Sequence, residues 1–172
     1  KPFYADEIKA RTYATQRKKI LIAMGGADEL DFTSKVASAV AGVDRELVII
    51  VGAGYENEQS LKNTLDSKGA KYEIKTNVTD MLSEYLACDF AVGAGGLTSS
   101  ELVASRTPCV LIATYEHQIA RCEYFGSNGW AKYLGFRDID YSALATAVDD
   151  FIPTFCDNIF ETKAIADAIR AC

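Results

Sequence analysis

The sequence is poor in histidine and lacks the residue spacings that are typical of metal sites. It contains a single histidine, His117, and no two of its five cysteines are spaced as C-x-x-C. The acidic pair Asp149-Asp150 does not belong to a motif for Mg²⁺. The residues therefore indicate neither a metal site nor a histidine paired with a second catalytic group. We predict that the protein uses no metal and no cofactor.

Positive charge and long apolar runs are also scarce. Eighteen Lys and Arg against 24 Asp and Glu give a net charge of -6, which argues against a nucleic-acid partner or an anionic membrane surface, because either needs a basic patch. No apolar run approaches the roughly 18 to 20 residues that span a bilayer, and the first residues lack a signal-peptide pattern. Cys88 and Cys109 lie inside apolar runs, which is typical of buried free thiols in a reducing compartment. We therefore predict a cytoplasmic protein with no membrane span.

What the sequence does have is a regular alternation of short apolar runs and longer helical patterns. With 172 residues, 49% of them hydrophobic, it can form one domain with a full core. The predicted strands are 19–24, 46–51, 71–75, 88–93, 108–113 and 131–135. The predicted helices are 31–41, 57–68, 79–87, 98–105, 117–128 and 141–151. Several strands are apolar on both faces, which predicts an α/β fold: a Rossmann-like, doubly wound parallel sheet of about six strands, covered on both sides.

The two ends differ from this core. Residues 1–18 are polar and basic, which is more typical of a connecting segment than of a core element. Residues 153–172 open with Pro153 and predict an extra C-terminal helix at 158–170. The predicted domain therefore covers residues 19–152. In such a fold the ligand binds outside the carboxyl ends of the strands, so the residues that follow each strand are the candidates for function.

The first strand is followed by 24-MGGAD-28. Gly25 and Gly26 allow a sharp turn and a close approach of the backbone to a ligand, and the start of the next helix favours an anion. A plain turn that needs a positive φ explains the same residues equally well. The second strand is followed by 52-GAGYEN-57, which begins like G-x-G-x-x-G but has Asn57 at the third glycine position. As a dinucleotide signal it is weak, and we favour a structural turn.

The third strand is followed by 76-TNVTDM-81. Asn77, with Thr79 or Asp80, can cap the next helix, and Val78 and Met81 offer apolar surface to a flat base. A capped helix with its hydrophobic staple is the favoured interpretation. After the fifth strand come His117 and Gln118. A phosphate or sugar ligand, a general base and a solvated helix start all remain open there.

The strongest pattern follows the fourth strand, where 93-GAGG-96 precedes 97-LTSSE-101. The hydroxyl residues Thr98, Ser99 and Ser100 suit a helix start, where they cap the helix or bind phosphate. The carboxylate of Glu101 is a natural acceptor for a vicinal diol such as ribose. The same residues fit a T-x-x-E capping box, and the spacing alone favours that box.

These segments occur together in an order that resembles a known family. The blocks are 20-ILIAMGGAD-28, 77-NVTDMLSEYLACDFAVGAGGLTSSELVASRTPCVLI-112, 117-HQ-118 and 126-GSNGWAKYLG-135, so the resemblance covers roughly residues 18–135. The chain resembles the C-terminal half of GT-B-type UDP-sugar hydrolases of pseudaminic acid biosynthesis, with the related spore-coat polysaccharide proteins. It is more distantly similar to the N-acetylglucosaminyltransferase of peptidoglycan synthesis. The resemblance implies one half of a GT-B fold.

The resemblance also implies a set of nucleotide-binding residues. Those are Gly25, Gly26, Val78, Gly95, Gly96, Leu97, Thr98, Glu101, His117 and Gln118. The paired glycines would lie near the pyrophosphate, Val78 would border the uracil, and the helix start at Thr98 would bind phosphate. Glu101 would bind the ribose hydroxyls, and Gln118 with His117 would reach toward the sugar or phosphates.

The chain departs from the family in two ways. Ala27 stands where the family usually has Ser, so one hydroxyl contact to phosphate is lost. Family members also have an N-terminal domain, in which a histidine is thought to activate water in the hydrolases. Residues 1–18 would then be an interdomain connector, and the missing N-terminal domain would be a partner. The catalytic residue in this chain is unknown.

The expected function follows from this resemblance. It is a domain that binds UDP or a UDP-sugar, from a hydrolase or glycosyltransferase of bacterial surface polysaccharide or pseudaminic acid biosynthesis. The alternatives are a non-catalytic nucleotide-binding or regulatory module and an NAD-dependent oxidoreductase.

Overall fold

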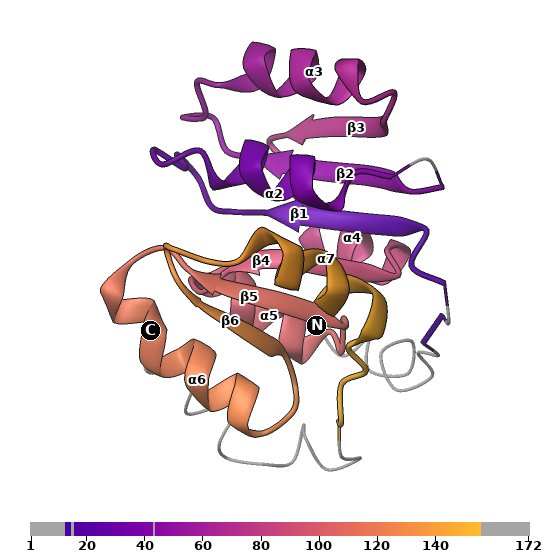
Figure 1. The fold of residues 1–172 in the computed structure, drawn as a ribbon. Helices are drawn as coiled ribbons and strands as arrows, with labels where there is room; N and C mark the ends of the chain where they lie inside the picture. The colour runs from indigo at the N-terminus through magenta and orange to yellow at the C-terminus, as the bar shows by residue number, and fades with distance from the viewer. Residues whose placement is uncertain (1–12, 15, 43, 156–172) are drawn as a thin grey trace.

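The computed structural model describes residues 13–14, 16–42 and 44–155, and it contains one six-stranded sheet. The strands are β1 (Lys19–Ala23), β2 (Glu46–Val51), β3 (Lys71–Thr76), β4 (Phe90–Ala94), β5 (Cys109–Ala113) and β6 (Lys132–Phe136). Every neighbouring pair is parallel, and the order is β3-β2-β1-β4-β5-β6 (Figure 1). The predicted Rossmann-like, doubly wound sheet is confirmed.

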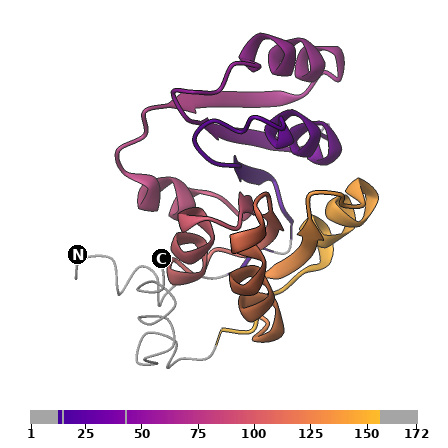
Figure 2. The ribbon, with the colours of Figure 1, turned by 90° about the vertical axis from the view of Figure 1, so that its left-hand side faces the viewer.

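Helices cover both faces of the sheet. The α-helices are α2 (Phe32–Val40), α3 (Glu58–Ser67), α4 (Met81–Ala87), α5 (Leu97–Ala104), α6 (Ile119–Ser127) and α7 (Tyr141–Asp150), and a 3₁₀ turn, η2 (Glu116–Gln118), precedes α6. In Figure 2, the indigo α2 and yellow-orange α7 lie on one side of the sheet, and the pink α4 and α5 lie on the other. The hydrophobic core therefore consists of two clusters, one on each face of the sheet.

Strand β1 illustrates why both faces are apolar. Ile20 and Ile22 belong to the cluster beneath α2, α3 and α7, while Leu21 and Ala23 belong to the cluster beneath α4, α5 and α6. Successive side chains of a strand point to opposite faces, so a strand that is covered on both sides must be apolar throughout. The continuous apolar runs in the sequence have this cause.

One predicted helix start needs correction. Helix α5 begins at Leu97 with Gly96 as N-cap, so Thr98 is the second residue inside the helix and the capping box at 98–101 is wrong. Asp80, one of the two alternatives with Thr79, caps α4 by accepting a hydrogen bond from Ser83 N. Asn57 occupies the N-cap of α3 without a side-chain bond. A glycine turn that continues straight into helix leaves no room for a hydroxyl cap at the start of α5.

The ends of the chain lie largely outside the described residues. This applies to the predicted helix at 158–170 and to most of the predicted connector at 1–18. Within the described part, Cys88, Cys109 and Cys122 are buried, as predicted for the first two. The described residues include no helix of the length and apolarity needed to cross a membrane.

The strand order creates a crevice at one position. Strands β1 and β4 are neighbours, and the helices that follow them, α2 and α5, lie on opposite faces. The loops after β1 and β4 therefore diverge at the carboxyl edge of the sheet. Such a switch point is where open α/β sheets bind their ligands.

Candidate functional site

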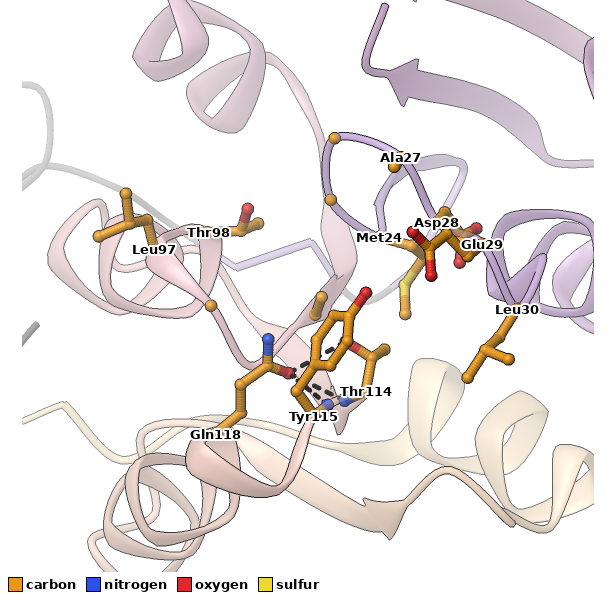
Figure 3. A pocket seen from close by; sticks show the side chains of 14 residues that line it. Met24, Ala27, Asp28, Glu29, Leu30, Leu97, Thr98, Thr114, Tyr115 and Gln118 are labelled. Carbon is orange, nitrogen blue, oxygen red and sulfur yellow. Dashed lines mark hydrogen bonds between the residues drawn. The ribbon is translucent and has the colours of Figure 1, made fainter. Parts of the chain in front are cut away.

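A pocket of about 330 Å³ lies at this switch point (Figure 3). It lies where three loops meet, those after β1, β4 and β5. Its lining residues are Met24, Gly25, Gly26, Ala27, Asp28, Glu29, Leu30, Ala94, Gly96, Leu97, Thr98, Thr114, Tyr115 and Gln118. Six of the ten residues implied by the resemblance are among them: Gly25, Gly26, Gly96, Leu97, Thr98 and Gln118. Three loops that are far apart in the sequence thus form one site.

One wall of the pocket is the start of helix α5. No side chain caps this helix, because the N-cap residue is Gly96. The backbone N–H groups of Leu97 and Thr98 are in the first turn, where no intrahelical acceptor exists. The Leu97 side chain is 66% exposed. The positive end of the α5 dipole therefore opens into the pocket with free donors, an arrangement that favours an anion.

The side chain of Gln118 reinforces this donor wall. Its Oε1 accepts hydrogen bonds from Thr114 N at 2.9 Å, Thr114 Oγ1 at 3.1 Å and Tyr115 N at 3.3 Å. These three donors fix the amide orientation, so the Nε2 group points away from them, toward the start of α5 (Figure 3). A Cβ placed on Gly96 would lie 3.6 Å from Nε2. No described residue accepts a bond from this nitrogen, although Gln118 is only 6% exposed.

Gly95 lies behind this wall and does not line the pocket. A Cβ at this position would lie 2.5 Å from Cys122 Sγ and 2.9 Å from Gln118 Cβ, so only glycine lets α6 pack this closely. The Gly95 carbonyl accepts a hydrogen bond at 3.4 Å from Nη1 of Arg121. That guanidinium is a positive charge beside the α5 start, and nothing in the sequence pattern distinguished it from a surface arginine.

The start of α2 behaves differently from the sequence expectation. Asp28, with a φ of 44°, turns its carboxylate onto the helix, where it accepts bonds from Phe32 N at 2.9 Å and Thr33 N at 2.6 Å. Asp31 is the N-cap and accepts from Ser34 N. The protein's own carboxylates thus already occupy the free amides at this helix start, which favours the plain turn over an anion site there. With Glu29 exposed beside it, this wall of the pocket is negative.

The glycines after β2 have a packing role. A Cβ on Gly52 would lie 2.1 Å from the carbonyl oxygen of Gly26 and 2.5 Å from its Cα. The loop that carries Gly25 and Gly26 thus passes directly over Gly52. The structural turn that we favoured for 52-GAGYEN-57 has this physical cause, and it accounts for Gly52 without a dinucleotide.

Four implied residues lie outside the pocket lining. Besides Gly95, Val78 lies half-buried in the loop between β3 and α4. His117 stacks on Tyr115, with ring centroids 5.8 Å apart. Glu101 is on the exposed face of α5, one turn beyond Leu97, and receives a hydrogen bond from Tyr85. Val78 and Glu101 would meet a ligand only if it extended from the pocket over α5 toward α4.

Four residues that line the pocket were not identified from the sequence. Glu29, Leu30, Thr114 and Tyr115 follow β1 and β5, so the rule on strand ends points to their segments. Their side chains carry no motif, and which of them face the pocket depends on loop geometry. Among the described residues, no group of three or more His, Cys, Asp or Glu is placed to hold a metal ion.

Comparison with known proteins gives a consistent picture. The spore coat polysaccharide biosynthesis protein SpsG of Bacillus subtilis is 26% identical over 126 residues, which cover 71% of this chain and 37% of that protein. The UDP-N-acetylglucosamine--N-acetylmuramyl-(pentapeptide) pyrophosphoryl-undecaprenol N-acetylglucosamine transferase of Azotobacter vinelandii is 29% identical, with 69% and 35% covered. The crystal structure of MurG from Acinetobacter baumannii has a TM-score of 0.59 at 17% identity, with 94% and 53% covered.

The chain thus spans little more than a third of the length of these two curated relatives. The glycosyltransferase family 28 C-terminal domain matches residues 11–168, which is most of the chain. The chain belongs to this family of glycosyltransferase C-terminal domains.

Proposed function

We propose that this domain binds a UDP-sugar, with the diphosphate at the start of α5. The observation that carries the proposal is the convergence of two sets of free donors on one end of the pocket. They are the first-turn amides of α5 and the Nε2 group of Gln118, which lines the pocket. Amide donors and a helix dipole in a partly enclosed site bind phosphate oxygens well, because these donors already point toward the anion before it binds.

The charge distribution of the pocket then orients the ligand. Asp28 and Glu29 make the β1 side negative, so the phosphates are repelled from that wall and attracted to α5. The glycosyl group would lie on the β1 side, where carboxylates accept its hydroxyls. The nucleoside would run over the exposed face of α5 toward Glu101 and Val78. This direction gives all the implied residues except Gly95 and His117 a contact with the ligand.

The relatives support uridine as the base and a sugar as the group handled. The Azotobacter enzyme is named as a transferase that uses UDP-N-acetylglucosamine, and the Bacillus protein as one of spore coat polysaccharide biosynthesis. We therefore propose the donor half of an enzyme of bacterial surface polysaccharide or peptidoglycan synthesis. A second domain would supply the acceptor, a sugar hydroxyl in a transferase or water in a hydrolase such as that of pseudaminic acid synthesis. The buried cysteines Cys88, Cys109 and Cys122 fit work in the reducing cytoplasm.

The contribution of this chain to the reaction would be electrostatic. When the bond between the sugar and UDP breaks, negative charge grows on the leaving phosphate. The α5 amides, Gln118 Nε2 and the nearby Arg121 would stabilise that charge without a metal.

The test is calorimetric titration of the chain with UDP, UMP and uridine. We expect UDP to bind, UMP to bind at least about tenfold more weakly, and uridine to bind weakest, because each phosphate adds charge-assisted bonds. The variant Gln118→Glu keeps acceptor oxygens for Thr114 and Tyr115 but replaces the NH₂ donors by a negative oxygen. We expect it to lose at least about tenfold in UDP affinity.

Gln59→Glu is the matched control, because it makes the same change on the exposed surface of α3. Equal affinity for UDP and uridine, or an unchanged affinity in Gln118→Glu, would contradict the proposed phosphate site. Absence of UDP binding altogether would overturn the proposed function.

A further inference from the structure

A buried tyrosine on α4 reaches across to Glu101 on α5. Tyr85 is 1% exposed, and its hydroxyl donates a hydrogen bond to Oε2 of Glu101 at 2.7 Å. The tyrosine ring belongs to the hydrophobic cluster that also contains Leu102 and Val103 of α5. The carboxylate of Glu101 is thus exposed to solvent, while one of its oxygens is hydrogen-bonded to the buried Tyr85.

The phenol of Tyr85 is the donor in this bond. Burial, together with the bond to Glu101, raises the pKa of Tyr85 far above its usual value, so the phenol remains a donor. A glutamate on an exposed helix face is otherwise free to change rotamer, and fixing such a side chain costs conformational entropy. No described residue binds the second carboxylate oxygen. The bond from Tyr85 therefore fixes the orientation of the carboxylate, and the lone pairs of this second oxygen are available to a ligand.

We propose that Tyr85 is a positioning residue for the recognition of a ribose diol. It fixes Oε2 of Glu101, so that the other oxygen is preorganised to accept the 2′ and 3′ hydroxyls of the nucleotide. The proposal rests on the proposed function, because it needs a ribonucleotide bound along α5. It adds that selection of ribose over deoxyribose depends on a side chain that never touches the ligand.

The simpler alternative is that the bond only fastens α4 to α5. The chain offers a matched control for it, since Tyr72 donates a hydrogen bond to Asp66 Oδ1 at 2.8 Å, also from a phenol to a carboxylate. That pair joins β3 to the end of α3 and includes no residue of the pocket lining. Removal of either hydroxyl takes away one phenol–carboxylate bond and keeps the aromatic ring.

The experiment compares UDP and 2′-deoxy-UDP binding by the wild type, Tyr85→Phe, Tyr72→Phe and Glu101→Gln, with thermal unfolding of each. In Tyr85→Phe we expect UDP affinity to fall about tenfold, the value of one hydrogen bond to a charged group, and 2′-deoxy-UDP affinity to fall less than about threefold. The preference for UDP then shrinks. Tyr72→Phe should retain the wild-type preference.

The results distinguish a failure of the proposed UDP binding from a failure of the proposed role of Tyr85. If no variant and no wild type binds UDP, the proposed function fails. If the wild type and Glu101→Gln differ in ribose preference but Tyr85→Phe keeps the wild-type preference, the positioning role is refuted and Tyr85 is a fold contact. The double variant Tyr85→Phe/Glu101→Gln is measured as well. If its preference for UDP equals that of Glu101→Gln, the role is supported, because both residues then act through one interaction. Additive losses in the double variant would contradict it.

Discussion

The substitution Gly52→Ala tests how the walls of the pocket are held. Gly52 follows β2, and a methyl group there would lie 2.1 Å from the carbonyl oxygen of Gly26, 2.5 Å from its Cα and 2.6 Å from its carbonyl carbon. All three atoms belong to the backbone, so no side-chain rotation relieves the contact. Either the loop after β1 moves or the end of β2 does.

The size of the effect follows from these distances. Overpacking a well-filled site costs about 1–3 kcal/mol, and more where the neighbour cannot move aside. We expect Gly52→Ala to reduce the free energy of unfolding by about 3 kcal/mol or more. For a chain of this length each kcal/mol lowers Tm by about 2–4 °C, so the expected loss is about 6–12 °C. Because Gly26 lines the pocket, UDP affinity should fall as well.

Gly54→Ala is the control, made two residues further along the same turn. Its methyl would meet the Ala27 Cβ at 3.5 Å, which is ordinary van der Waals contact. We expect its Tm to stay within about 4 °C of the wild type, since a tolerated glycine-to-alanine change shifts stability by about 1 kcal/mol or less. Circular dichroism melts and urea unfolding measure both variants. If Gly52→Ala melts together with Gly54→Ala, the close passage of the two loops is refuted.

Two further predictions concern the wall at α5. Gly95→Ala should lower Tm, because its methyl group would lie 2.5 Å from Cys122 Sγ. Gly96→Ala, whose methyl group would lie 3.6 Å from Gln118 Nε2, should keep the wild-type Tm and weaken UDP binding. Thermal melts and UDP titrations that rank the two variants otherwise would contradict this prediction. Burial raises the pKa of the Cys122 thiol to about 12 from 9.0. As pH rises, the thiol therefore ionises in the unfolded chain first, and the free energy of unfolding falls by up to about 1.4 kcal/mol per pH unit between these two values. Urea unfolding of Cys122→Ser from pH 8 to 11 should show a shallower loss than the wild type, and parallel curves would refute the contribution.

The sequence by itself determined the architecture. Apolar runs such as 46-ELVIIV-51 and 108-PCVLIA-113 are buried on both faces, and short runs of this kind that alternate with helical patterns pack well only in a parallel sheet with helices on both sides. Their positions predicted all six strands to within two residues at each end. The pattern also placed the candidate site at the carboxyl edge, because that follows from strand direction alone.

The tertiary structure alone decided the chemistry of each wall. Two helix starts, at α2 and α5, were both candidates for binding an anion. The positive φ of Asp28 turns its carboxylate onto the amides of α2, whereas the glycine N-cap leaves those of α5 free. Backbone dihedrals of this kind depend on packing between loops and cannot be read from residue types.

The same holds for contacts between distant residues. Nothing in the sequence singled out Tyr85 within the predicted helix 79–87, and spacing alone favoured a capping role for Glu101. The packing of α4 and α5 brings the two side chains together at 2.7 Å. Gly52 and Gly26 are adjacent for the same reason. Local periodicity encodes which face of an element is buried, but only the assembled sheet determines which residues lie across from one another.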